Sequence, residues 1–312
     1  MTLKTINFFI ATVDPHKATV VSFPEFIAIF GGTISSSGKK SKAKSQRDVF
    51  VRWWSENRKD LKDLMLLPEN YDDWSDFNTY SDLLLFEKDL GYLTSAVLVF
   101  LEAPGAIAEL GAFSQIDSLS ERLVIVVTEN HHPRNSFISL GPIRSVAKTQ
   151  GHANSVCVIP DVKPEELARH ILVVVNTLDQ KRARTNPNST FNPEDSQHEI
   201  LLVLDLVNLF LVCQITELQF LLSHFGIDVK IARLEQILFL LEKTQLVTCQ
   251  HYGDNKYFVP RKFRKIYVDY TSKSGAASFK RDRAKADIWT EVQKDPFRKN
   301  VFELANKGGH AK

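Results

Sequence analysis

The chain has 312 residues, of which 44% are hydrophobic and 24% are charged, and its 13 glycines and 12 prolines are too few for a disordered or fibrous protein. This length predicts two globular domains of roughly 150 residues each. The formal net charge is only +2. Any nucleic-acid binding must therefore come from a local basic patch and not from the protein as a whole.

The sequence contains no membrane or export signal that we can identify. No segment approaches the roughly 20 apolar residues that a membrane helix requires. The apolar residues 7–13 are followed by Asp14 and His16, without the cleavage pattern of a secretory signal. The three cysteines are far apart: Cys157, Cys213 and Cys249. This usage indicates free thiols in a reducing compartment, so we expect a soluble, cytoplasmic protein with no membrane partner.

In the first part of the chain, short apolar segments rich in β-branched residues alternate with amphipathic helical segments. We expect strands at residues 26–30, 64–67, 96–101, 123–128 and 155–159. We expect helices at about 46–62, 79–92, 106–118, 135–149 and 163–183. This alternation predicts an α/β domain over residues 1–183 with a doubly wound, parallel five-stranded sheet. Its ligand should bind at the carboxyl ends of the strands.

The pattern changes after residues 184–197, which are rich in asparagine and proline and are expected to form a linker. Three apolar helices are expected at residues 199–213, 215–225 and 229–244. Two short strands, at 246–251 and 256–260, should then form a hairpin around a tight turn. Three helices followed by a hairpin predict a mostly α winged-helix-type domain over residues 198–312, with a basic carboxyl-terminal extension.

The strongest candidate for chemistry is Glu109. It follows the buried strand after Pro104 and Gly105, which permit a sharp turn into a helix and are themselves candidates for substrate binding. A carboxylate there lies at the active edge of the sheet, near the positive end of the helix dipole, which favours its ionised form. An ionised carboxylate is the group that attack on an anomeric carbon requires. The alternative is a surface glutamate that only complements the helix dipole.

Two other segments follow expected strands at the same edge. Gly31, Gly32 and Thr33 offer backbone amides and a hydroxyl that suit a phosphate or a ribose, although a plain turn would have the same composition. Basic residues follow that could steer an anion or simply be solvated: Lys39, Lys40, Lys42, Lys44 and Arg47.

The second segment begins with two adjacent histidines, His131 and His132, after the fourth strand. No third ligand has suitable spacing, so we expect no metal site. Asn135 and Arg144 are candidates for contact with the substrate base or phosphate. We expect Phe137 to pack as part of a lid or helix start.

Residues 261–285 form a basic segment with interleaved aromatic residues. The residues assigned there to nucleic-acid or partner binding are Arg261, Lys262, Arg264, Lys265, Lys280, Arg281 and Arg283. The aromatic residues are Tyr267, Tyr270 and Phe279. Such a mixture suits phosphate contacts and base stacking, whereas a solvated tail or a protein docking surface could also have it. The expected third helix has little positive charge for reading DNA.

Four segments, in order and spacing, resemble the nucleoside 2-deoxyribosyltransferases and, more closely, the type II effectors of bacterial retron anti-phage systems. The motif Pro-Gly, three residues and Glu-Leu-Gly-Ala-Phe lies at residues 104–113. The others are the Gly-Gly turn at 30–33, Leu-Leu-Leu-Phe-Glu at 83–87, and residues 136–144. The resemblance covers about residues 24–180 and extends to the second domain only as architecture.

The resemblance implies a deoxyribosyltransferase-like fold and a toxin that cleaves the N-glycosidic bond of NAD or a nucleotide, without a cofactor. Glu109 would be the nucleophile or would stabilise the oxocarbenium ion. Glu87, or Asp89 near it, would bind sugar hydroxyls or help proton transfer. The expected partners are a retron reverse transcriptase and its msDNA, an RNA-linked DNA, which hold the toxin inactive. Homo-oligomers are also expected, because deoxyribosyltransferases complete their sites across subunits.

Two alternatives remain open. The Pro-Gly and Glu109 also match part of the Pro-Gly-Gly-x-Gly-Thr-x-x-Glu signature of nucleotide phosphoribohydrolases, but Ile107 and Ala108 stand where Gly-Thr is expected. Such an enzyme, or a deoxyribosyltransferase, would serve nucleotide salvage. The other alternative is a nucleotide-sensing, DNA-binding regulator, which should bind specific DNA in isolation.

Overall fold

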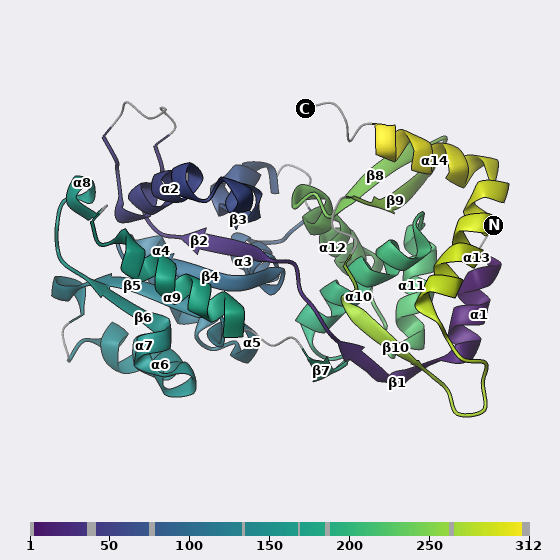
Figure 1. Ribbon diagram of the computed structural model, residues 1–312, viewed down its shortest axis with the longest axis horizontal. Coiled ribbons are helices and arrows are strands. Elements are labelled where there is room, and N and C mark those ends of the chain that lie inside the picture. Colours follow the sequence, from purple (N-terminus) through teal and green to yellow (C-terminus); the bar gives the residue numbers. More distant parts are fainter. Residues whose placement is uncertain are drawn as a thin grey trace. The chain divides into compact units, whose positions relative to one another are not determined.

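The computed structural model describes residues 3–35, 42–74, 79–132, 135–167, 169–184, 188–261 and 265–307. The chain divides into two compact units (Figure 1). We call Pro24–Asp73 with Leu83–Thr185 the α/β unit, and Met1–Phe23 with Trp74–Asp82 and Asn186–Lys312 the helical unit. The amino-terminal residues and the segment Trp74–Asp82, which the sequence analysis placed in the α/β domain, thus lie in the helical unit.

The α/β unit contains the expected parallel five-stranded sheet, in the order β3-β2-β4-β5-β6 (Figure 1). Its strands are β2 (Phe26–Phe30), β3 (Met65–Leu66), β4 (Thr94–Phe100), β5 (Leu123–Thr128) and β6 (Val156–Ile159). All residues of β2, β4 and β5 are buried. Continuous apolar strands of this kind are typical of a sheet with both faces covered.

Helices cover both faces of the sheet. Ile27 and Ile29 share one buried cluster with Trp54 of α2 (Gln46–Asn57) and Val174 of α9 (Ile171–Arg184). Side chains of successive strand residues point to opposite faces. Accordingly, the Phe30 ring instead lies 5.2 Å from the ring of Phe113 in α4 (Pro104–Phe113). The helix α3 (Leu83–Tyr92) also contacts β4.

The strand order creates a switch point between β2 and β4. From β2 the chain moves outward to the edge strand β3, and it then returns to β4 on the opposite side of β2. In open parallel sheets, ligands bind where the strand order reverses, outside the carboxyl ends of the two strands. Gly31 follows β2 and Glu102 follows β4, so the candidate segments meet at this point.

Short elements complete the α/β unit. They are η1 (Lys59–Leu64), η2 (Pro68–Trp74), α5 (Asp117–Ser120), η3 (Glu129–His131), η4 (Ser139–Ile143), α6 (Arg144–Gln150), α7 (His152–Ser155) and α8 (Pro164–Leu167). The helix expected over 135–149 is a π-helical turn followed by α6. Pro142, which lies inside that turn, has no N–H to donate and therefore interrupts a regular α-helix.

The helical unit contains three helices and a hairpin where the sequence predicted them. The helices are α10 (Ser196–Phe210), α11 (Ile215–His224) and α12 (Ile231–Lys243). The hairpin pairs β8 (Val247–Tyr252) with β9 (Asn255–Pro260) in antiparallel register. From Ile200 to Phe210, α10 is buried on all sides, so it forms the centre of this unit.

The basic extension is folded. A three-stranded sheet, β10-β1-β7, joins β1 (Val13–Val20) to β10 (Val268–Ser272) and β7 (Ser189–Thr190). Three further helices, α1 (Lys4–Thr12), α13 (Arg281–Lys294) and α14 (Pro296–Lys307), belong to the same unit. Neither this sheet nor these helices were predicted from the sequence. The terminal parts of the chain therefore form one folded body.

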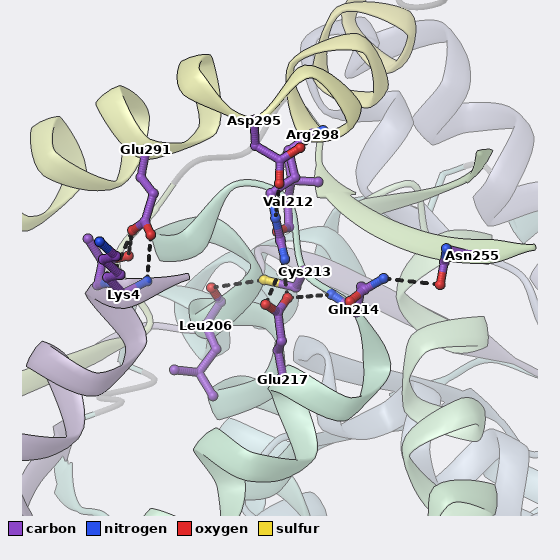
Figure 2. Close-up of polar contacts among 11 residues, drawn as sticks. Lys4, Leu206, Val212, Cys213, Gln214, Glu217, Asn255, Glu291, Asp295 and Arg298 are labelled. Carbon is purple, nitrogen blue, oxygen red and sulfur yellow. Dashed lines mark hydrogen bonds and ion pairs between the residues drawn. The ribbon is translucent and has the colours of Figure 1, made fainter. Parts of the chain in front are cut away.

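Polar contacts hold the carboxyl-terminal helices in place (Figure 2). Arg298 of α14 donates to Glu217 at the start of α11, with a distance of 2.7 Å between Nη2 and Oε1, and both side chains are almost fully buried. Glu291 of α13 accepts from the backbone amides of Lys4 and Thr5, which begin α1. The buried charges of Arg298 and Glu217 require such pairing, so their contact is structural.

Among the helices of the described residues, none combines the length and apolar character that a membrane span requires.

Candidate active site

Glu109 lies in the second turn of α4, directly outside the carboxyl end of β4. Ala103 is extended and Pro104 occupies the first turn, so the chain bends from the strand into the helix as the sequence predicted. Pro104 and Gly105 are exposed, whereas Glu109 is half-buried. The Glu109 Oε2 atom is buried, with no hydrogen-bond partner in the described part of the chain. A buried acceptor without a partner is rare in native proteins and calls for an explanation.

Glu87 of α3 is the second carboxylate of the site. Its side chain is buried, and burial raises its pKa to about 8, with a further contribution from the charge of Glu109. Burial likewise raises the pKa of Glu109 to about 7. Two interacting carboxyls titrate as a pair, so near neutral pH the two groups together retain about one proton. Asp89, the alternative to Glu87, is fully buried.

This result corrects one expectation from the sequence. The helix dipole was expected to keep Glu109 ionised, but desolvation of the half-buried carboxyl outweighs it and raises the pKa. The position of Glu109 at the edge of the sheet was predicted by its place after the strand. Its protonation was not, because burial depends on side chains from other elements.

Arg47 is the cation of this site. It lies in the first turn of α2 and is 5% exposed. Its Nη2 atom is 2.6 Å from Oε2 of Glu69 in η2. The positive charge of Arg47 lowers the pKa of Glu109 and of Glu87, whereas the negative charge of Glu69 raises both. The four side chains therefore form one electrostatic group, drawn from α2, η2, α3 and α4.

Glu102 fixes the backbone around this group. Its carboxylate accepts from the backbone N–H of Gly32 at 3.1 Å, of Gln46 at 2.6 Å and of Arg47 at 2.9 Å. It thus joins the end of β4 to the turn after β2 and to the start of α2. Ser45, the N-cap of α2, accepts from the Asp48 amide and donates to the Thr33 carbonyl. The turn after β2 is therefore held rigidly.

The contacts of Glu102 change the interpretation of the glycine turn. Gly31 has φ +152°, and a Cβ atom there would lie 2.8 Å from the Cβ of Phe100, so glycine is required by close approach. A Cβ atom on Gly32 would lie 2.7 Å from that of Ser45. The Gly32 amide, which was expected to be free for a phosphate, already donates to Glu102. Thr33 is exposed.

The other residues predicted to bind the substrate lie in the segment after β5. Asn135 and Arg144 are exposed, at the start of this segment and of α6. The ring of His132 stacks on that of His152 at 5.8 Å, and its Nδ1 lies 3.2 Å from the Ser139 hydroxyl. Phe137 was expected to pack, but it is 84% exposed. Within the described ranges, no group of three or more His, Cys, Asp or Glu side chains is placed to hold a metal ion.

A family model described as "STM3845 retron effector protein" matches residues 43–249. The chain belongs to this family of retron effectors. The match covers the candidate carboxylates and continues through α12 into β8.

Two relatives of this retron effector come from Escherichia coli. The first is named "Retron Ec73 putative ribosyltransferase/DNA-binding protein" and is 27% identical over 187 residues, which cover 50% of this chain and 58% of the relative. Its counterpart from retron Ec86 carries the same description and is 35% identical over 66 residues, or 21% of this chain and 22% of the relative. The chain thus matches less than two thirds of the length of each.

The basic segment of the effector divides into structural and exposed residues. Arg281 donates to Oδ2 of the fully buried Asp205 at 2.7 Å and to the Val268 carbonyl at 2.9 Å. Tyr267 and Tyr270 are buried, and the ring of Phe279 lies 5.9 Å from that of Tyr270. These aromatic residues form the core of the helical unit and not a surface for stacked bases, and Arg281 is committed to Asp205.

The other residues of this segment that were predicted to bind nucleic acid differ in their exposure to solvent. Lys265, Lys280 and Arg283 are exposed, and Arg261 is half-buried. Lys262 and Arg264 lie outside the described residues. The roles of Glu69 and Glu102 were not predicted from the sequence, in which Arg47 stands as one residue of a basic run. Only the position of Glu102 at the end of a strand could have indicated its role.

Proposed function

We propose that this retron effector cleaves the N-glycosidic bond of NAD or another nucleotide. The observation that carries the proposal is the Glu109 Oε2 atom at the switch point of the sheet, which is buried without a partner in the described residues, together with the buried carboxyl of Glu87, whose pKa is raised by burial and by the charge of Glu109. A buried acceptor at this position is explained if a substrate atom completes it. The family and the ribosyltransferase in the names of both relatives support the same chemistry.

In the first step, the ionised carboxylate of Glu109 attacks the anomeric carbon from the face opposite the base. The bond from that carbon to the base nitrogen breaks, and its electron pair leaves with the base. Nicotinamide in NAD carries a positive charge on that nitrogen and therefore departs as a neutral molecule. A purine or pyrimidine base would need a proton, which the protonated carboxyl of Glu87 can donate.

In the second step, water attacks the anomeric carbon and releases the sugar from Glu109. Glu87, ionised after donating its proton to a purine or pyrimidine, accepts a proton from this water. With NAD as substrate no proton has left Glu87, so the proton of the water goes to solvent or to the released Glu109. The raised pKa of Glu87, about 8, fits a group that begins the cycle protonated.

We further propose that the fold of the α/β unit resembles that of the deoxyribosyltransferases, that the three helices and hairpin of the helical unit form a winged-helix-type domain, and that the effector forms homo-oligomers. A retron reverse transcriptase and its msDNA would hold the toxin inactive. The exposed side chains of Lys265, Lys280 and Arg283 support a contact with nucleic acid. Asn135 and Arg144, exposed after β5, would contact the nucleotide.

The test compares nucleotide pools by mass spectrometry in cells that express the intact effector, Glu109→Gln or Glu166→Gln. Glu166 is an exposed glutamate of α8 and serves as the matched control. Loss of NAD or of another nucleotide with the intact protein and with Glu166→Gln, but not with Glu109→Gln, supports the proposal. We expect Glu109→Gln to lower the rate at least about a thousandfold. Equal loss with Glu109→Gln removes this residue from the mechanism.

A DNA-binding regulator is the second candidate, because both relatives are also named as DNA-binding proteins. The discriminating measurement is binding of the isolated protein to a library of duplex DNA. Selection of one sequence, with nucleotide pools unchanged in the first experiment, would favour the regulator.

A further inference from the structure

Glu102 binds three backbone amides with one carboxylate. Its Oε1 atom accepts from the amides of Gly32 at 3.1 Å and of Arg47 at 2.9 Å, and its Oε2 atom accepts from the amide of Gln46 at 2.6 Å. Gly32 lies in the turn after β2, whereas Gln46 and Arg47 are the first two residues of α2. Three main-chain donors from two segments therefore converge on one acidic side chain.

Donors of this kind bind phosphate in many nucleotide-binding domains. In doubly wound sheets, a glycine-rich turn after a strand and the start of the next helix both present backbone amides to the phosphate groups of the ligand. Gly32 and the start of α2 hold these positions at the switch point between β2 and β4. In this effector, the group that they bind is a side chain of the effector itself.

The amides at the start of α2 are already used, and the space beside Gly32 is filled. Asp48, the third residue of the helix, donates its amide to the Ser45 hydroxyl at 2.9 Å. A Cβ atom on Gly32 would lie 3.0 Å from both the carboxyl carbon and the Oε1 atom of Glu102. The turn is too close to Glu102 for even a methyl group, so a phosphate does not fit between them.

The charge of Glu102 opposes a phosphate as well. A phosphate that approached these amides would stand beside a carboxylate of like charge, and such repulsion is strong where water is partly excluded. Arg47 offers little compensation, because its guanidinium is paired with Glu69 at 2.6 Å. Hydrogen bonding, space and charge thus all favour Glu102 over a ligand phosphate at this turn.

We propose that Glu102 is a specificity-determining residue that takes the place of a substrate phosphate at the turn after β2. A phosphate of the substrate then gains no affinity from the amides of Gly32, Gln46 and Arg47, and this turn selects no ligand by its phosphate. The inference rests on the proposed function only in placing a nucleotide at the switch point of the sheet.

The experiment follows the Gly32 amide by NMR while inorganic phosphate is added. Isotope labelling of the glycine carbonyls and amides selects Gly32 and Gly309, the two glycines that directly follow another glycine, and Gly309→Ala identifies the second signal. In the intact effector we expect millimolar phosphate to leave the Gly32 signal unchanged. Glu102→Ala releases the three amides, so phosphate should shift this signal and bind at least about tenfold more tightly than to the intact protein.

Two further variants complete the test. Glu102→Gln retains the size of the side chain, but its NH₂ group cannot accept from an amide, so it should give a smaller gain in phosphate binding. It replaces Glu102→Ala if that variant does not fold. Glu166→Ala is the matched control, because it removes the same charge from an exposed position in α8 of the same unit, and it should behave as the intact protein does.

Three results would overturn the proposal. They are a phosphate-dependent shift of Gly32 in the intact effector, no gain of phosphate binding in a folded Glu102 variant, and an equal gain in Glu166→Ala. Inorganic phosphate is not cleaved, so its binding is independent of catalysis. The expected phosphate results together with unchanged nucleotide pools in cells would therefore contradict the proposed catalysis and leave the role of Glu102 standing.

Discussion

Asp205 of the helical unit and Glu109 of the α/β unit differ in how their carboxylate oxygens are paired. In the helical unit, Asp205 accepts from the amides of Tyr267 and Val268, from the Tyr270 hydroxyl and from Arg281. In the α/β unit, Glu109 keeps one buried oxygen without a partner in the described residues. Full pairing of a buried carboxylate stabilises a fold, whereas a buried carboxylate oxygen without a partner lowers stability and calls for a functional explanation. The contrast separates structural charges from functional ones.

The largest expected effect concerns Arg298 and Glu217 of the helical unit, whose buried charges are paired with each other. Arg298→Met should lower the free energy of unfolding by about 3–5 kcal/mol, because Glu217 would remain buried without its partner. Arg58→Met, which removes a partly exposed pair with Asp179, should cost about 1 kcal/mol or less. Urea denaturation of both variants provides the comparison. A similar loss of unfolding free energy in the two variants would mean that the buried Arg298–Glu217 pair contributes no more to stability than the partly exposed one.

The next effect concerns the rigidity of the candidate site. Gly32→Ala should cost about 1–3 kcal/mol, because the new Cβ would lie 2.7 Å from Ser45 Cβ and 3.0 Å from the Glu102 carboxyl carbon. Gly111→Ala in α4 is the matched control. Its Cβ would meet nothing within 4 Å, and alanine favours a helix more than glycine does. We therefore expect equal or higher stability in the control and a lower urea midpoint in Gly32→Ala. Equal urea midpoints in the two variants would contradict the view that Glu102 and Ser45 pack tightly against Gly32.

The pH dependence of the free energy of unfolding tests whether burial raises the pKa values of Glu109 and Glu87. Folded pKa values of about 7 for Glu109 and about 8 for Glu87 lie above the unfolded value of 4.5. Below pH 4.5 both carboxyls are protonated in both states, and their contribution is fully present. As pH rises toward 8 the unfolded chain ionises first, so stability is lost. After allowance for solvent screening, which acts mainly on the half-buried Glu109, we expect a loss of about 1–2 kcal/mol between pH 5 and pH 8.

The Glu109→Gln variant isolates this contribution, because it removes one carboxyl and its repulsion of Glu87. Subtracting the two pH curves cancels groups that both proteins share, among them His198 and His224, whose lowered pKa values give the opposite slope. The variant should lose less stability between pH 5 and pH 8. Parallel curves would show that burial does not raise the pKa of Glu109.

The elements that the sequence predicted best are those with a continuous local signal. The boundaries of β2 and β5 agree with the prediction, because an uninterrupted apolar run in a parallel sheet is buried on both faces. The position of Glu109 followed from its place between a strand and a helix. These features depend on neighbours in sequence, so a single chain reveals them.

The features that the sequence did not predict depend on distant partners. The strand β1 contains Pro15 and His16 and lacks a clear apolar alternation, and its partner β10 lies near the other end of the chain. Arg47 stands in a basic run, and nothing local shows that Glu69 and Glu102 bind it. Arg281 was assigned to a partner for the same reason, since its pairing with Asp205 arises only on folding.

The smallest expected effect concerns Tyr80, and it shows whether the segment Trp74–Asp82 contributes to the stability of the helical unit. The hydroxyl of buried Tyr80 donates to the Gln236 carbonyl at 3.2 Å, and Gln236 Nε2 donates to the Thr79 carbonyl at 2.9 Å. Tyr80→Phe removes one of these bonds and retains the ring beside Phe239, so we expect a cost of about 1 kcal/mol. Hydrogen exchange of the α12 amides should accelerate by about fivefold if the segment stabilises that helix. Unchanged protection of α12, with the same loss of global stability, would place the contribution of Tyr80 elsewhere in the unit.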